Sequence, residues 1–188
     1  MRYRQPLPPA RFWRGPVPRR WLFTDERMPG DAIAAVRALP PRSGIVFRHY
    51  ATPAAGRARL LRRIARIAVA RGHWLLVGGA DHRSFAYAAP HDRGAVSAGV
   101  HNVREAEQAR RAGLALIFVS PVFATRSHPG AAPIGVSGFA QVARTSTGMA
   151  IALGGMDARR FRLLRRHGAH GWGAIDALTV TKRERKRG

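Results

Sequence analysis

The chain has 188 residues, of which 46% are hydrophobic, and this suits one domain with a sizeable core. Its formal net charge is +23, from 33 Lys and Arg against 10 Asp and Glu, and it contains no cysteine. The lack of thiols excludes disulfides, thiolate metal sites and cysteine nucleophiles. No apolar run reaches the ~20 residues of a membrane span and no secretory signal is recognisable, so we expect a cytoplasmic protein with no membrane partner.

The surplus positive charge favours polyanions through counterion release. The arginines fall on the outer faces of predicted helices and at both termini, and they do not form one compact recognition element with interleaved aromatic residues. We therefore expect nucleic acid to bind only nonspecifically. The composition predicts three parts: a Pro- and Arg-rich arm over 1–20, a single domain over 21–179 and a basic tail over 180–188.

Short apolar runs alternate with helix-period segments along the predicted domain. The periodicity and the capping residues predict, in chain order, a strand over 21–26, a helix over 30–39, a strand over 43–50, a helix over 53–72, strands over 73–79, 84–90 and 95–101, a helix over 102–113, a strand over 114–123, a helix over 136–145, a strand over 149–156, a helix over 157–168 and a strand over 169–178. In the second helix, Leu60, Leu61, Ile64, Ile67 and Ala68 are predicted to share one face.

The apolar runs are continuous rather than alternating, which indicates a parallel sheet covered by helices. Eight such strands predict an α/β fold of the (β/α)8 TIM-barrel type, with an open doubly wound sheet as the alternative. The stretch between Gly79 and Ala95 is too short for two normal βα connections. We therefore expect the helices after strands three and four to be reduced or missing, and the exposed apolar surface to be covered by a homodimer or by the N-terminal arm.

Active sites of parallel barrels lie at the carboxyl ends of the strands. Gly154 and Gly155 stand between a strand and a helix that begins at Asp157, where open backbone N–H groups and the helix dipole suit a phosphate. A tight turn that needs glycine is the other interpretation. Asp25 and Glu26 follow the first strand, and adjacent residues there point to opposite faces, so we expect one carboxylate to be buried and the other solvated.

The second half of the sequence resembles a known family. The segments "VSAGVHNVREAEQARRAGLALIFVSPVFATRSHPGAAPIG", "AIALGGMDARRF" and "GWGAIDAL" are similar to those of the thiamine phosphate synthase/TenI family, and "WLFTDE" and "IVFRHY" resemble its first two strands. The resemblance implies a TIM barrel that joins a pyrimidine methyl diphosphate to a thiazole phosphate, with loss of pyrophosphate and the help of Mg²⁺. The phosphorylated substrate is then the small-molecule partner.

The resemblance also implies site residues. The implied catalytic residues are Arg48 at the diphosphate, with Ser97, Thr125, Ser127 and His128. The implied phosphate-binding residues are Gly154, Gly155, Ile175 and Asp176. Tyr50, His101 and Arg126 complete the pocket, and Asp92 is the implied ligand of Mg²⁺. From the residues alone, Arg48 could instead be an ion-pair partner at the barrel rim, His101 a structural group at a helix start, and His128 an exposed loop residue.

Several positions depart from the family pattern. Tyr50 replaces a lysine, Ser127 and His128 replace a Thr-Lys pair, Gly78 and Gly79 replace an Asn-Asp pair that serves the metal, and Asp176 replaces a serine. Ser120 stands where tautomerases of the TenI type have a histidine. Two alternatives to synthase activity therefore remain. One is a non-catalytic or altered barrel that binds a phosphorylated thiazole-type ligand, and the other is a basic protein that binds nucleic acid nonspecifically. The place of segment 120–135 after the sixth strand, and its similarity to the family's substrate loop, imply that this segment closes over the substrate.

Overall fold

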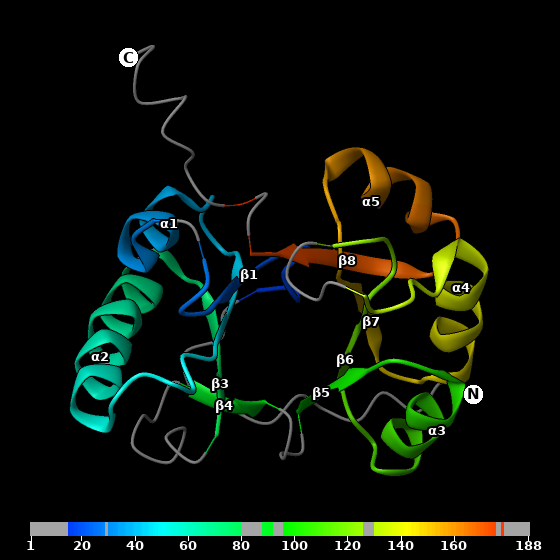
Figure 1. The fold of residues 1–188 in the computed structure, drawn as a ribbon, viewed down its shortest axis with the longest axis horizontal. Helices are drawn as coiled ribbons and strands as arrows, with labels where there is room; N and C mark the ends of the chain where they lie inside the picture. Colours follow the sequence, from blue (N-terminus) through cyan, green and yellow to red (C-terminus); the bar gives the residue numbers. More distant parts are fainter. Residues whose placement is uncertain are drawn as a thin grey trace.

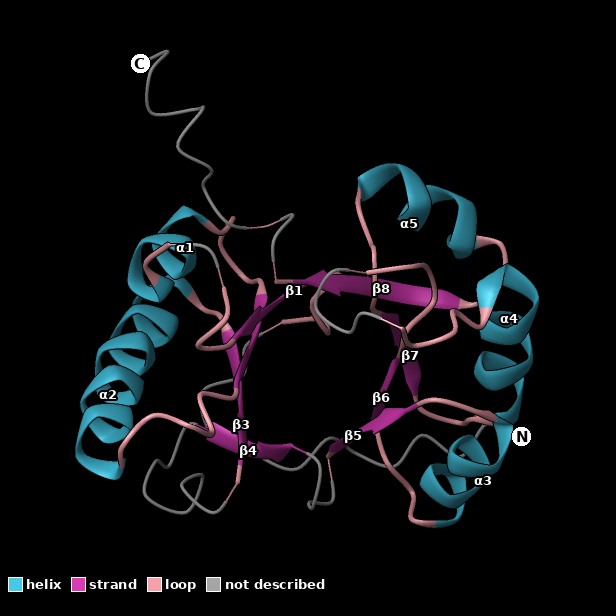
Figure 2. Ribbon diagram, in the orientation of Figure 1, coloured by secondary structure: helices cyan, strands magenta, loops and turns pink. Residues whose placement is uncertain are grey.

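Parallel strands surround the centre of the molecule in the computed structural model, and helices lie outside them (Figures 1 and 2). The structure describes residues 15–28, 30–79, 88–91, 96–125, 130–175 and 178. The strands are β1 Arg20–Thr24, β2 Gly44–Phe47, β3 Trp74–Gly78, β4 Ala88–His91, β5 Ser97–Val100, β6 Leu116–Val119, β7 Met149–Ala152 and β8 Ala169–Ala174. The helices within this described part are α1 Ala32–Ala38, α2 Ala54–Arg71, α3 Val103–Arg111, α4 Gly135–Thr145 and α5 Ala158–Arg165.

Each strand runs parallel to its neighbour, and the strands follow one another in chain order. β8 returns to pair with β1, so the strands form a closed barrel and the open doubly wound alternative is wrong. The pairing is weakest between β4 and β5, where a single residue pair, His91 with Ser97, is in register. The described part holds five helices, which follow β1, β2, β5, β6 and β7. The predicted reduction of the helices after β3 and β4 falls on residues 80–87 and 92–95, outside the described residues.

The helices begin and end where the sequence places caps. The side chains of Asp31, Asn102 and Asp157 each accept a hydrogen bond from a backbone N–H in the first turn of α1, α3 and α5. α2 ends at Gly72, whose φ of 65° suits glycine, and its backbone N–H bonds back to Ala68 and Val69. Local capping therefore fixes the starts of α1, α3 and α5 and the end of α2, and these boundaries lie close to the predicted ones.

Two clusters of apolar side chains fix the helices to the barrel. On one side, Ile45 and Phe47 pack with Leu61, Ile64 and other residues of α1 and α2. On the other side, the outer faces of β5 to β8 pack against α3, α4 and α5. In α2, Leu61, Ile64 and Ala68 are buried and Leu60 and Ile67 pack partly buried against the same cluster, so the predicted apolar face is confirmed.

Aromatic rings fill the barrel interior. Trp21 makes edge-to-face contacts with Trp74 and Phe118, at centroid distances of 6.4 and 5.2 Å. The indole of Trp21 takes the space that a side chain at Gly44 would occupy, since a Cβ there would lie 2.1 Å from the ring. The filled interior leaves the strand ends as the place for a functional site.

The residues before β1 also belong to this packing. Val17 is buried in the interior cluster, and the Trp21 indole N–H donates to the carbonyl of Pro18 at 2.8 Å. The ring of His170, in β8, donates from Nε2 to the carbonyl of Val17 at 3.1 Å. Segment 17–20 of the predicted arm therefore closes against β1 and β8, while residues 1–14 and the predicted tail lie outside the described residues. No helix in the described part is long and apolar enough to cross a membrane.

Candidate active site at the carboxyl ends of the strands

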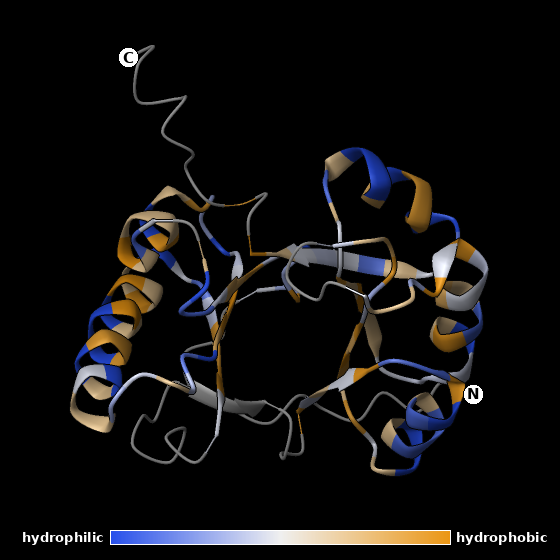
Figure 3. Cartoon of the chain, viewed as in Figure 1, coloured by the Kyte–Doolittle hydropathy of each residue, from blue (hydrophilic) through white to orange (hydrophobic). Residues whose placement is uncertain are grey.

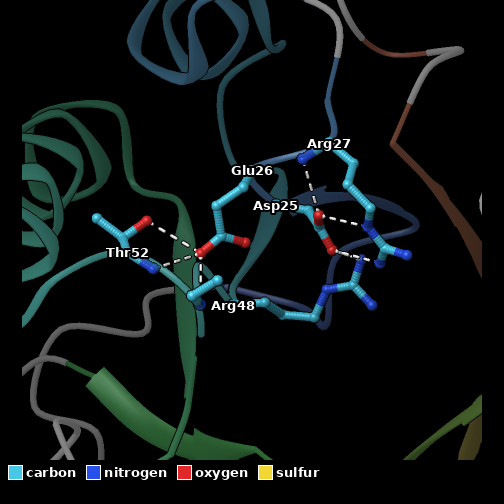
Figure 4. A network of polar contacts seen from close by, with 6 residues as sticks. Asp25, Glu26, Arg27, Arg48 and Thr52 are labelled. Carbon is cyan, nitrogen blue, oxygen red and sulfur yellow. Dashed lines mark hydrogen bonds and ion pairs between the residues drawn. The ribbon is translucent and has the colours of Figure 1, made fainter.

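An ion-paired carboxylate joins the ends of β1 and β2 (Figure 4). Asp25 follows β1 and is buried, whereas Glu26 is exposed, which confirms the prediction of one buried and one solvated carboxylate. Asp25 Oδ2 accepts hydrogen bonds from Arg48 at 2.7 Å and from Arg27 at 2.8 Å, and its Oδ1 accepts from the side chain and the backbone N–H of Arg27. The side-chain bonds from Arg27, more than the charge of Arg48, hold the pKa of Asp25 well below its usual range, although burial opposes this shift.

Arg48 is therefore fixed in position before any ligand arrives. Its guanidinium lies 5.3 Å from the centroid of the Phe23 ring, and its backbone N–H donates to the carbonyl of Thr24. Its side chain is only 17% exposed. β2 ends at Phe47, earlier than predicted, and Arg48 begins the turn that carries it inward to Asp25. The structure thus shows Arg48 as an ion-pair partner at the barrel rim. This ion pair also holds the guanidinium in place, so a contact with an anionic ligand stays a prediction for Arg48.

Glu26 holds the connection between β2 and α2. Its Oε1 accepts hydrogen bonds from the backbone N–H groups of Ala51 and Thr52, both at 2.8 Å, and from the hydroxyl of Thr52 at 2.9 Å. Burial alone would raise the pKa of Glu26, but these bonds outweigh it and the pKa lies below its usual value. Figure 4 shows Glu26 reaching toward Thr52, on the side away from Asp25. Sequence reasoning missed this role because it depends on a contact 26 residues away.

Tyr50 and Arg57 cover the end of β3. Arg57 is buried in the first turn of α2, its guanidinium lies over the rings of Phe47 and Tyr50, and it donates to the carbonyl of Gly78 at 2.7 Å. A Cβ on Gly78 would lie 2.1 Å from the Tyr50 hydroxyl. Tyr50 therefore occupies the space that a side chain at position 78 needs, so the tyrosine and the glycine fit as a pair. Arg57 was not among the predicted site residues, and its buried place follows only from the packing of α2 on β2.

The loop after β6 is bonded to the turn after β7. Val122 N–H donates to the carbonyl of Leu153 at 2.8 Å, and Phe123 N–H donates to that of Gly154 at 3.1 Å. The predicted strand over 114–123 thus ends at Val119, and the following residues pair with a turn instead. Thr125 is half-buried in this loop. Arg126, Ser127 and His128 lie outside the described residues.

Gly154 and Gly155 combine a steric role with open donors. Their φ angles are 84° and 58°, and a Cβ on Gly154 would lie 2.8 Å from Pro121, so the tight-turn interpretation is well supported. Within the described part of the chain, neither glycine donates a hydrogen bond from its backbone N–H. The carbonyl of Gly155 accepts from Arg160, whose guanidinium lies 4.7 Å from the centroid of the Phe123 ring. Two open N–H groups and a nearby guanidinium suit an anion.

The remaining predicted residues lie in three different settings. Ser97 is the first residue of β5 and is completely buried, so it lies at the beginning of its strand rather than with the residues after the strand ends. His101 follows β5, and its Nδ1 lies 2.9 Å from Glu105 in the capping box that starts α3, in keeping with a helix-start group. Ile175 follows β8 and packs partly buried against the core. Asp176 and Asp92 lie outside the described residues.

The described residues do not assemble a site for Mg²⁺. They contain no group of three or more His, Asp or Glu side chains that could hold a metal ion. Gly78 has no side chain that could be a ligand, and its carbonyl accepts a hydrogen bond from Arg57. Asp25 is already committed to two arginines. The predicted ligand Asp92 falls outside this part of the chain, so the metal stays a prediction.

The fold and the strand-end residues define a parallel β/α barrel whose rim presents fixed arginines and open backbone donors. A sequence profile described as thiamine monophosphate synthase (TMP-TENI) matches residues 77–178, more than half of the chain. The chain belongs to this thiamine phosphate synthase/TenI family, as the resemblance in its second half indicated.

One curated protein is similar to part of this chain, and two solved structures share its fold. A putative thiamine-phosphate synthase 2 of Aquifex aeolicus (strain VF5) is 33% identical over 75 residues, which span 40% of this chain and 40% of that protein. The structure of a thiamine phosphate pyrophosphorylase from Pyrococcus furiosus superposes with a TM-score of 0.69 at 16% identity, covering 84% of this chain and 85% of the other. FabK from Thermotoga maritima superposes with a TM-score of 0.50 at 11% identity, over 84% of this chain and 57% of the other. The two structural matches bear on the fold alone.

Proposed function

We propose that this protein is a shortened TIM barrel that carries out the synthase reaction of its family. It would join a pyrimidine methyl diphosphate to a thiazole phosphate and release pyrophosphate. The observation that carries the proposal is the fixed position of Arg48, which Asp25 and Phe23 hold at the strand ends where the resemblance requires a diphosphate contact. The membership of the family and the open donors of Gly154 and Gly155 support it.

The chemistry that these residues would serve is electrostatic. The bond between the pyrimidine methylene carbon and the diphosphate breaks, both electrons leave with the diphosphate, and the thiazole supplies the electron pair of the new bond. Arg48 would stabilise the charge that grows on the leaving group, at no cost of reorganisation because its guanidinium is already held. The N–H groups of Gly154 and Gly155, at the start of α5, would bind the phosphate of the thiazole. Thr125 would line the pocket between them.

A direct assay tests the proposal. Purified protein is incubated with both precursors, with and without Mg²⁺, and thiamine phosphate and pyrophosphate are measured. We expect turnover that falls at least ~100-fold in Arg48→Gln, as for loss of one preorganised charged contact. Arg27→Gln is the matched control, since it removes the other arginine on Asp25 and should retain most of the turnover. Equal turnover in wild type and Arg48→Gln would refute the assigned role.

One observation favours a second candidate, a barrel that binds a phosphorylated thiazole-type ligand without converting it. Tyr50 and Gly78 fit together at the place where the resemblance implies a lysine and a metal-binding pair. This packing would leave the thiazole phosphate contact at Gly154 and Gly155 intact. Calorimetric binding of the thiazole phosphate together with turnover at background would establish this candidate and reject the synthase.

A further inference from the structure

A line of four arginines runs along the outside of α2, on the face turned away from the barrel. We call Arg59, Arg62, Arg63 and Arg66 the arginine stripe. All four are exposed, and each lies three or four residues from two of the others, so they share one face over about two helical turns. Figure 1 shows α2 at the outer edge of the molecule, and Figure 3 shows hydrophilic residues alternating with hydrophobic ones along it.

No carboxylate among the described residues balances the charge of the stripe. None of its four arginines forms an ion pair or hydrogen bond within the described part of the chain. α2 contains no Asp or Glu, and segment 30–79 holds nine arginines against one carboxylate, Asp31, which caps α1. Like charges at these spacings destabilise a helix. α3 is different, because Glu107 pairs with both Arg110 and Arg111 there.

The surroundings of the stripe restrict what can bind to it. A second copy of the chain carries the same net charge of +23 and is repelled. A membrane surface is disfavoured, because Leu61, Ile64 and Ala68 of α2 are buried against the barrel and Val69 is the one large apolar side chain that the helix exposes. Single-stranded nucleic acid is disfavoured as well, since α2 has no aromatic side chain on which bases could stack. The ligand that remains for the stripe is a regular array of phosphates.

We propose that the arginine stripe is a docking surface for the phosphate backbone of double-stranded DNA. Guanidinium groups match phosphate oxygens with two parallel hydrogen bonds. The stripe covers about 10 Å along the helix axis, from the ~1.5 Å rise per residue, and the ~12 Å major groove of B-form DNA admits an exposed helix with phosphates on either side. The corresponding groove of double-stranded RNA is too narrow for side chains to read. The binding is independent of sequence and of the small-molecule site.

The stripe is preferred to the arginines of α5 for a structural reason. Arg160 of α5 bonds to Gly155 and lies over Phe123, so the beginning of α5 belongs to the candidate active site. α5 has only eight residues, whereas α2 has 18. Four other arginines in and after α5 are exposed and pair with no side chain in the described part of the chain, so they offer a control of equal charge: Arg159, Arg162, Arg165 and Arg166.

The test compares two variants that each lose four charges. One carries Arg→Gln at all four positions of the stripe, and the other carries Arg→Gln at 159, 162, 165 and 166. Binding to a short duplex DNA of mixed sequence is measured by fluorescence anisotropy across a salt series. We expect the stripe variant to lose most of the affinity and its log K against log[salt] slope to fall in magnitude by roughly 3 to 4, at ~0.9 per phosphate contact. The control variant should keep at least half of the wild-type slope.

The outcomes separate the partners. Equal losses in both variants would show that net charge alone drives binding and would overturn the proposal, as would tighter binding to single-stranded DNA, to double-stranded RNA or to vesicles with anionic lipid. Both variants should fold, because glutamine has a favourable helix propensity and the substituted positions are exposed. Circular dichroism checks this. Independently of any variant, dicarbonyl labelling of arginines in the wild-type protein should show protection of the stripe by duplex DNA. Labelling unchanged by DNA would refute the surface.

Discussion

Asp25 and Arg48 belong to consecutive strand ends, and a hydrogen bond of 2.7 Å from the guanidinium to Oδ2 joins them. The carboxylate of Asp25 is 7% exposed and the side chain of Arg48 is 17% exposed, so little solvent screens the pair. Asp25 therefore acts as a positioning residue for Arg48, and the two should be tested together.

Asp25→Asn should lower the free energy of unfolding by about 3 kcal/mol at pH 7, because it leaves two arginines without their anion. Since the folded-state pKa of Asp25 is lowered, its contribution is fully present above the unfolded-state value near 3.8 and is lost as the pH falls below it. Urea denaturation at pH 7 and pH 3 measures this. The variant should lose less stability than wild type on acidification, and an equal loss in both proteins would contradict the role of Asp25.

A second pH effect arises at His73, whose Nδ1 accepts a hydrogen bond from the backbone N–H of Ser43 at 3.1 Å. Burial and, next, the charge of Arg71 lower its pKa to about 4. The unfolded chain, with a value near 6.5, then binds more protons between these limits. We expect the unfolding free energy to fall by on the order of 2 kcal/mol as the pH drops from 6.5 to 4.

The matched variant is His73→Asn, whose side-chain oxygen can still accept from Ser43. Its stability should depend less on pH over the same interval, and NMR titration of the wild-type imidazole should give a midpoint far below the usual one. A normal histidine midpoint for His73 would disprove the assignment. His49, buried and stacked on Phe47, has a pKa lowered chiefly by burial and acts in the same direction.

Gly154 and Gly130 make a controlled pair, because both have a φ of 84°. A Cβ on Gly154 would lie 2.8 Å from Pro121, whereas nothing lies within 4 Å of one on Gly130. Gly130→Ala should cost about 1 kcal/mol from the backbone alone. Gly154→Ala should cost at least about 2 kcal/mol more and abolish binding of the thiazole phosphate, as measured by thermal unfolding and calorimetry. Equal costs would show that the contact with Pro121 is unimportant.

Tyr50 and Gly78 should behave as a coupled pair. Gly78→Ala brings a methyl group against the Tyr50 hydroxyl and should destabilise the protein. In a Tyr50→Ala background the same change should cost about 1 kcal/mol less, which is a coupling energy typical of residues in contact. Denaturation of the four proteins of the double-mutant cycle measures it. Additive effects would mean that Tyr50 moves aside freely, as its 56% exposure allows.

The sequence predicted the order and type of the elements well, for physical reasons. Continuous apolar runs such as Leu116–Val119 and capped helices such as α3 carry their signals locally. From the geometry of a strand end it predicted that one of Asp25 and Glu26 is buried, without deciding which of the two. It did not predict the partners of Asp25, since Arg48 reaches this carboxylate only once β1 and β2 lie side by side, and Arg27 joins it there.

The same limit applies to the rest of the site. Arg57 is close to Gly78 because α2 packs on β2 and β3, which no spacing in the sequence reveals. β2 and β6 end three and four residues before the predicted ends at 50 and 123. Arg48 and Val122 directly follow or continue the apolar runs in sequence, but they leave the strands to bond to Asp25 and to Leu153. Long-range contacts, rather than local propensity, decide these positions.

The hydrogen bonds from Val122 to Leu153 and from Phe123 to Gly154 join two loops whose bonded residues are 31 positions apart in sequence. A phosphate that settles on the turn at Gly154 and Gly155 would fix the base of the other loop at the same time, and with it the position of Thr125. Binding of one substrate would thereby order the binding site of the other. Each substrate would then bind more tightly in the presence of the other, because a coupling between two sites is reciprocal.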